Sequence, residues 1–233
     1  MAAPVFIANA ALIARKAMNA VDFRLTEKFA KVVQFLVVHP TAATSLRGKN
    51  PPAIGSQEYI ERQAFAFAQA RQPHAPQPPK TIPDEVVSLI LVEYFDIKSQ
   101  AVERIKREHA LSMGAENLVG DLLERYLASV LEPADWVWCS GAMVRAADFI
   151  RPPATRTGLW RLLQIKNRDN SENSSSSRVR EGTAIEKWHR TFSRKSGSNW
   201  SAFPDESLRQ QLSETGFKDY VRDILRVVRT YGN

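Results

Sequence analysis

The stretch that decides the fold is Asp148-Phe149-Ile150, followed after a turn by Leu162-Leu163-Gln164-Ile165-Lys166-Asn167-Arg168. Both pieces are apolar and alternating, and they are bounded by turn-forming residues, so we expect two strands. Successive side chains of a strand point to opposite faces, so Gln164 and Lys166 share one face and Ile165 lies on the other. If the two strands pair, Asp148 lies beside Gln164 and Lys166, and a carboxylate, an amide oxygen and an ammonium group meet at one point.

This combination suits metal-assisted hydrolysis of a phosphodiester. The carboxylate of Asp148 would hold a hard divalent cation, and Lys166 would position or activate the attacking water. Two structural alternatives stay open at this stage. Asp148 could be a strand-end aspartate paired with an arginine, and Gln164 could simply hydrogen-bond a neighbour.

The positive charge of the chain is concentrated around the same stretch. The whole sequence has 32 Lys and Arg against 25 Asp and Glu, and residues 145–195 alone contain 12 basic and 5 acidic side chains, so they account for the full excess of +7. A polyanionic partner favours such a distribution, although a solvated basic face would give it too. Arg and Asn are also common readers of base edges. The candidate contacts to DNA are Asn167, Arg168, Asn170, Asn173, Arg178, Arg180, Lys187 and Arg190.

Several classes of protein are disfavoured by composition. Cys139 is the only cysteine, so no disulfide can form within the chain, and the four histidines are scattered rather than clustered for metal binding. No apolar run approaches the ~20 residues needed to span a bilayer. The N-terminus lacks a basic segment before its apolar stretch, so no secretory signal is expected. We therefore expect a cytoplasmic protein without a membrane partner.

Hydrophobic periodicity predicts helices on both sides of the strands. The expected helices cover residues 8–20, 26–38, 56–71, 84–95, 99–112, 113–131 and 183–193, with an amphipathic tail over 206–230. Residues 136–150 are expected to form a hairpin that turns near Ser140-Gly141. Five prolines mark residues 72–83 as a linker. The prediction is an α/β (α+β) fold, a mixed sheet flanked by helices, with residues 1–80 as an N-terminal helical segment and 81–233 as the core.

The helix expected over 113–131 contains a further candidate, Glu116. At 100° per residue Glu116 falls at the edge of the apolar side, whereas Asp121 and Arg125 fall on the opposite, solvent side. A carboxylate turned toward the core needs a partner, because an unpaired buried charge is costly. The alternative is a glutamate near a helix N-terminus that interacts favourably with the helix dipole.

Asp148 followed by Gln164-Ile165-Lys166 resembles the signature of the PD-(D/E)xK nucleases, an aspartate and then Glu or Gln, any residue, and Lys. The wider run from Leu162 to Ser174, with Gly182-Thr183 and Lys187-Trp188, is similar to the SinI-type family of type II restriction endonucleases, which cut GGWCC. This likeness covers the chain from Pro83 to Trp200. Most PD-(D/E)xK nucleases have Glu or Asp where this chain has Gln164. A neutral amide binds a cation more weakly than a carboxylate does, so one or two metal ions remain possible.

The resemblance implies a restriction-endonuclease-like core and a magnesium-dependent double-strand cut that leaves a 5′-phosphate and a 3′-hydroxyl. It implies that Glu116, Asp148 and the backbone carbonyl of Ile165 bind Mg²⁺, that Gln164 completes the site, and that Lys166 assists the water. It also implies a homodimer on double-stranded DNA and a cognate DNA methyltransferase in the same system, without a stable complex. Residues 1–80 would serve dimerisation or DNA clamping.

Two other functions stay open. A repair or recombination nuclease of the same superfamily, such as a junction resolvase, would share the site but recognise DNA shape. A DNA-binding module without catalysis would retain the basic stretch, with Gln164 marking a decayed site.

Overall fold

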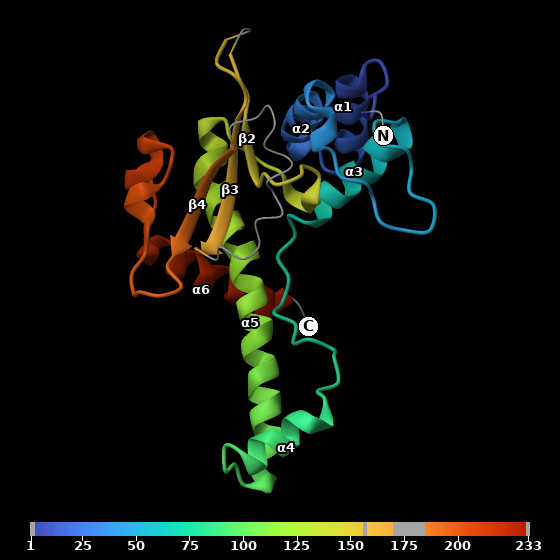
Figure 1. Ribbon diagram of the computed structural model, residues 1–233. Coiled ribbons are helices and arrows are strands. Elements are labelled where there is room, and N and C mark those ends of the chain that lie inside the picture. Colours follow the sequence, from blue (N-terminus) through green and yellow to red (C-terminus); the bar gives the residue numbers. More distant parts are fainter. Residues whose placement is uncertain (1–2, 156–157, 170–184, 232–233) are drawn as a thin grey trace.

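A computed structural model describes residues 3–155, 158–169 and 185–231 (Figure 1). Within these residues three helices come first, and a long helix precedes a small sheet. The elements in chain order are α1 (Ala10–Val21), α2 (Thr26–Val38), α3 (Gln57–Gln69), α4 (Glu85–Glu93), α5 (Ser99–Leu131), β1 (Val137–Trp138), β2 (Phe149–Arg151), β3 (Arg161–Arg168), β4 (Ile185–Thr191) and α6 (Glu214–Tyr231). The predicted α+β fold is confirmed.

The sheet is mixed, with strand order β1-β2-β3-β4. The first three strands are antiparallel, and Phe149 faces Leu163 across β2 and β3. Strand β4 runs parallel to β3, with Gln164 opposite Lys187 and Ile165 opposite Trp188. The predicted pairing of the two decisive strands is therefore confirmed.

The two faces of the sheet belong to two apolar cores. Ile150 and Leu162 point to one face and pack in a core with α1, α2 and α3. Phe149, Leu163 and Ile165 point to the other face and pack with α5 and α6. The strict alternation of these side chains follows from the period of two in a strand. The helices of residues 1–80 thus share a core with the sheet.

The helical prediction for residues 183–193 is wrong, because Ile185–Thr191 form strand β4. Pairing with β3 supplies the backbone hydrogen bonds, and Trp188 is buried against the α5–α6 side of the sheet. The two strands of the hairpin predicted over 136–150 are also shorter than expected. β1 and β2 have two and three residues, and between them Gly141, Ala142 and Ala146 have positive φ, which extended strands do not allow.

The helices predicted over 99–112 and 113–131 are one continuous helix, α5. Its C-terminal half lies along the sheet, and its N-terminal half extends away from the body and carries α4 at its end (Figure 1). Helices α1, α2 and α3 agree with the prediction, with Ser56 capping α3 through Tyr59 N–H. Among the described helices, none is long and apolar enough to cross a membrane.

Candidate active site

Asp148 lies directly before β2 and is fixed to β3 by two hydrogen bonds. Its backbone N–H donates to the Leu163 carbonyl over 2.9 Å, and its Oδ2 accepts the Ile165 N–H over 2.6 Å. The carboxylate is thereby held across from Gln164, as the sequence predicts. Burial raises the pKa of Asp148, and the Ile165 N–H and the charge of Lys166 oppose that rise.

Gln164 and Lys166 extend the site along β3. The register places Gln164 between Asp148 and Lys187, and it places Lys166 opposite His189 on β4. Side chains that pair across a sheet share a face, so Asp148, Gln164 and Lys187 lie side by side across three strands. Lys166 lies on the same face, two residues further along β3 and beside His189. Lys166 is exposed and Ile165 is buried on the other face. The predicted placement of Gln164 and Lys166 on one face of β3 and of Ile165 on the other is confirmed.

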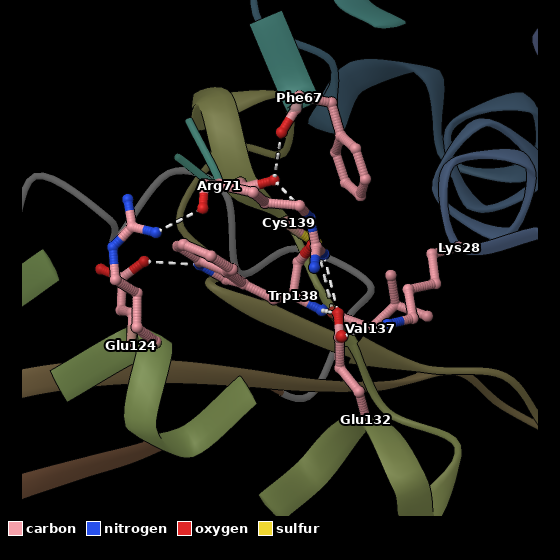
Figure 2. Close-up of polar contacts among 10 residues, drawn as sticks. Lys28, Phe67, Arg71, Glu124, Glu132, Val137, Trp138 and Cys139 are labelled. Carbon is pink, nitrogen blue, oxygen red and sulfur yellow. Dashed lines mark hydrogen bonds and ion pairs between the residues drawn. The ribbon is translucent and has the colours of Figure 1, made fainter. Parts of the chain in front are cut away.

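A second carboxylate at this site comes from α5, and it is Glu124. Its Oε2 accepts the indole N–H of Trp138 over 2.8 Å (Figure 2). Desolvation and the neighbouring charge of Asp148 raise the pKa of Glu124 from an ordinary 4.5 to about 7, against the opposing effects of Trp138 and Lys166. Glu124, Asp148 and Lys166 therefore interact electrostatically as one group.

Glu116 does not share this position. Its side chain is exposed, so the expectation that it faces the apolar side is wrong, and it precedes Glu124 by eight residues, or about 12 Å along the helix axis. The sequence does contain a signal for Glu124. Glu124 lies on one line of the helix with Gly120, Leu127 and Leu131. Its carboxylate therefore has small and apolar neighbours, and the same reasoning that favoured Glu116 applies to it.

Partly buried ion pairs hold the walls of the site in place (Figure 2). Arg71, just after α3, donates to Glu132 over 2.7 Å and to the Trp138 carbonyl over 2.8 Å. Glu132 also accepts from Lys28 of α2. The N-terminal helices are thereby tied to the strand that presents the indole of Trp138 to Glu124.

Arg125 forms a second tie, between α5 and the end of α3. It was predicted to lie on the solvent side of α5, but its side chain is 5% exposed. The guanidinium donates to the carbonyls of Ala70, Arg71 and Gln72 and to Asp121. The backbone carbonyls at the end of α3 have no partner within that helix, which gives a buried Arg a structural role that the helical pattern did not reveal.

The connection from β1 to β2 closes one side of a cavity of about 430 Å³ lined by Asp121, Glu124, Trp138 and Asp148. Gly141 has φ 77°, and a Cβ at that position would lie 3.0 Å from the Ala66 carbonyl. Ala142 and Ala146 also have left-handed backbone, at φ 55° and 61°. Such strained residues are common beside functional sites.

The donor atoms of the cavity suit a hard cation. Among the described residues no cluster of three or more His, Cys, Asp or Glu side chains is placed to hold a metal. However, Mg²⁺ in proteins is commonly bound by one or two carboxylates together with water and substrate phosphate. Asp148 and Glu124 provide two half-buried carboxylates whose charges disfavour each other, and a divalent cation would relieve that repulsion.

The predicted DNA contacts fall into three groups. Arg168 and Lys187 have exposed side chains near the site. Arg190 instead bridges Asn167 and Glu214 and lies over the Phe217 ring, with 13% of its side chain exposed, so its donors and the Asn167 oxygen serve contacts within the chain. The remaining candidates lie outside the described residues, namely Asn170, Asn173, Arg178 and Arg180.

A mixed sheet that holds an aspartate across from Gln-x-Lys, with a helix alongside that contributes a glutamate, has the architecture of a restriction-endonuclease-like nuclease core. The comparisons with known proteins agree. The SinI restriction endonuclease family model matches residues 10–227. The type II restriction enzyme Eco47I of Escherichia coli is 48% identical over 221 residues, which cover 94% of this chain and 96% of that protein. The type II restriction enzyme SinI of Salmonella infantis is 48% identical over 225 residues, which cover 96% and 97%.

The chain belongs to the SinI restriction endonuclease family. It is accordingly a type II site-specific deoxyribonuclease, a class of enzyme that acts on double-stranded DNA and generally needs a divalent metal ion. The match spans the N-terminal helices as well as the sheet.

Proposed function

We propose that the protein is a magnesium-dependent homodimer that cuts both strands of DNA at GGWCC and leaves 5′-phosphate and 3′-hydroxyl ends. The observation that carries the chemistry is the arrangement around Asp148, whose half-buried carboxylate interacts with Glu124 and lies across from Gln164 on the face that presents Lys166. The target rests on the likeness to the SinI family. The expected setting is the cytoplasm, in a system that includes a DNA methyltransferase for the same site.

In this proposal Asp148 and Glu124 hold Mg²⁺, and the Ile165 carbonyl and the Gln164 amide complete the set of oxygen ligands. Glu124 takes the place that the sequence assigned to Glu116. When bound, the cation would neutralise part of the charge of the phosphate and lower the pKa of the attacking water. Ile165 N–H fixes one oxygen of Asp148 and Trp138 fixes one oxygen of Glu124, so the two carboxylates are oriented before any ligand arrives.

Lys166 has a different part in the proposal. Its ammonium group opposes the rise in the pKa of both carboxylates, so it favours their ionised, ligating forms. Being exposed on the site face, it can also reach a phosphate or the attacking water. Arg168 and Lys187 would extend this positive surface along the DNA backbone. Asn170, Asn173, Arg178 and Arg180 remain candidate contacts to bases or phosphates.

The test is cleavage of a plasmid with one GGWCC site, with and without Mg²⁺. We expect linear product that requires Mg²⁺ in the wild type, no product from Asp148→Asn or Lys166→Met, and strong impairment of Glu124→Gln. Glu116→Gln is the matched control on the same helix and should cut normally. Cleavage by Asp148→Asn would refute the assigned site, and ends mapped away from GGWCC would refute the target.

The alternative functions give different results in the same assay. A junction resolvase would cut four-way junctions without GGWCC and would ignore methylation at that site, whereas the proposed enzyme should spare methylated DNA. A binding module without catalysis would shift DNA in a gel, lose that shift with added salt, and leave the plasmid intact. The names of both relatives support a restriction enzyme over either alternative.

A further inference from the structure

The cavity that contains Glu124 and Asp148 has a basic residue at its rim. Arg145 lies in the connection between β1 and β2, and among the described residues that line this cavity it is the one Lys or Arg. Arg145 is exposed, whereas Glu124 and Asp148 are half-buried. Arg145 belongs neither to the candidate DNA contacts nor to the proposed metal site, although it shares the cavity with both carboxylates.

The guanidinium of Arg145 has little to bind within the chain. Its Nη2 donates to the Ala43 carbonyl over 3.4 Å, which is longer than an ordinary N–H···O hydrogen bond. Among the described residues, no carboxylate forms an ion pair with Arg145. Arg125, by contrast, is paired with Asp121, which also lines the cavity. A guanidinium has several N–H donors, so most of those of Arg145 are available to a ligand.

The backbone that carries Arg145 is held by the N-terminal helices. Its N–H donates to the Ala42 carbonyl over 2.7 Å, and the Thr44 N–H donates to the Met143 carbonyl over 3.2 Å. The segment after α2 thereby pairs with the β1–β2 connection. Met143 and Val144 are buried in the core that contains α1, α2 and α3. Arg145 is therefore presented to the cavity from a fixed position.

The charges of the cavity favour an anion beside Arg145 once a cation is bound. In the proposed site the divalent cation offsets the charges of Glu124 and Asp148. Asp121, the third carboxylate that lines the cavity, is already paired with Arg125. Among the described residues of the cavity, no carboxylate is then left for Arg145, and a phosphate can provide the missing counter-charge. Arginine binds phosphate through parallel hydrogen bonds, which also fix the orientation of the phosphate.

We infer that Arg145 binds a phosphate of the DNA backbone next to the scissile phosphate. The inference rests on the proposed active site, in which Asp148, Glu124 and their cation take the scissile phosphate itself. Arg145 is exposed at the rim of that cavity, where a neighbouring phosphate of the same strand would pass. It would thus fix the register of the strand against the two carboxylates. The N-terminal helices would contribute to cleavage through their hold on the β1–β2 connection.

The position of Arg145 complements the basic residues already proposed to extend along the DNA. Arg168 and Lys187 lie on β3 and β4, whereas Arg145 lies on the connection that joins the edge strand β1 to β2. Asp148 is between these two groups in the sheet, directly before β2. A DNA strand that enters the site would therefore be held on both sides of the cut.

The test is a double-mutant cycle between Arg145 and single phosphates. The affinity for a short duplex with one GGWCC site is measured by fluorescence anisotropy, with Ca²⁺ in place of Mg²⁺ to keep the DNA uncut. In separate duplexes, a methylphosphonate removes the charge of each phosphate of the site in turn. Arg145→Gln should weaken binding of the unmodified duplex about tenfold and lower the slope of log affinity against log salt concentration by about 1. A methylphosphonate next to the mapped cut should weaken binding by the wild type about as much, and should have little effect on binding by Arg145→Gln.

Two matched variants separate the phosphate contact from a general loss of charge. Arg145→Lys should restore the salt dependence but only part of the affinity, because Lys lacks the parallel donors of a guanidinium. Arg222 on α6 has a side chain that is 62% exposed and pairs with Asp219, and Arg222→Gln should bind DNA as the wild type does. The urea midpoints of both Arg145 variants should match that of the wild type, because Arg145 makes only one long side-chain hydrogen bond among the described residues.

Some outcomes would overturn the inference. These are equal affinities of Arg145→Gln and the wild type, additive losses at every phosphate, or a coupling confined to the scissile phosphate. Plasmid cleavage in Mg²⁺ keeps the two proposals distinguishable. If Asp148→Asn stops cleavage while Arg145→Gln binds and cuts as the wild type does, the inference alone fails. A wild type that never cuts, but whose DNA binding loses affinity and salt dependence in Arg145→Gln, would end the functional proposal alone.

Discussion

Replacing Glu124 by Gln should make the metal-free protein more stable at neutral and alkaline pH. The pKa of Glu124 is raised from 4.5 to about 7 in the folded state, mainly by burial and by Asp148. The folded protein therefore binds a proton more tightly than the unfolded chain does, and stability falls as the pH rises from 4.5 through 7. The difference between the two pKa values corresponds to on the order of 3 kcal/mol at 1.36 kcal/mol per pH unit. Glu124→Gln keeps the acceptor for the Trp138 N–H and removes the ionisation.

The measurement is urea unfolding between pH 4.5 and 8.5 in the presence of EDTA, with circular dichroism as the probe. The free energies of unfolding of wild type and Glu124→Gln should follow the same pH trend only near pH 4.5. By pH 8 the free energy of unfolding of the variant should have increased relative to that of the wild type by up to about 3 kcal/mol. Glu116→Gln, with an exposed side chain on the same helix, should follow the wild type. Adding Mg²⁺ should flatten the wild-type curve because the cation stabilises the ionised carboxylates. Parallel curves for wild type and Glu124→Gln would refute the reasoning.

Three further substitutions test the supports of the site. Trp138→Phe removes the indole donor to Glu124, so the pKa of that carboxyl should rise further and the pH profile of DNA cleavage should move to higher pH. The free energy of unfolding should fall by about 1–3 kcal/mol. The control Trp200→Phe removes a comparable donor to another glutamate, and it should lower the free energy of unfolding without moving the pH profile. Arg125→Lys cannot reach three backbone carbonyls at once and should lower the free energy of unfolding by about 3 kcal/mol in urea; an unchanged midpoint would contradict the capping role. Ala146→Gly relieves a left-handed backbone and should raise the free energy of unfolding by about 1 kcal/mol in a thermal melt, whereas a lower melting temperature would mean that Ala146 is not strained.

The sequence allowed the sheet face of the site to be predicted because local rules determine it. Alternation places Leu163 and Ile165 opposite Gln164 and Lys166, and one apolar face must be buried, so the register of the two strands has little freedom. The same reasoning places Asp148 across from Gln164, as the structure confirms. Helices α2 and α3 were predicted for the same reason, since the spacing of apolar residues that indicates each helix is local to it.

The features that were missed depend on contacts between distant segments. Residues 185–191 have few local signals for a strand, and their pairing with β3 decides their structure. Arg125 resembles a surface charge until the carbonyls at the end of α3 surround it. Glu116 and Glu124 lie on one helix, and which of them meets Asp148 depends on where the sheet packs along α5. That position is a tertiary property, which helical periodicity does not determine.

Glu124 also accounts for the unusual amide at position 164. With Glu124 contributed by α5, the site contains two carboxylates although Gln164 is neutral. Lys166 offsets one of their charges, so a net charge of about −1 faces a divalent cation when both acids are ionised. A glutamate at position 164 would add a third negative charge beside two carboxylates whose pKa values are already raised by burial. In the proposed site, Gln164 would supply an oxygen ligand without increasing the repulsion between carboxylates that the metal-free fold must withstand.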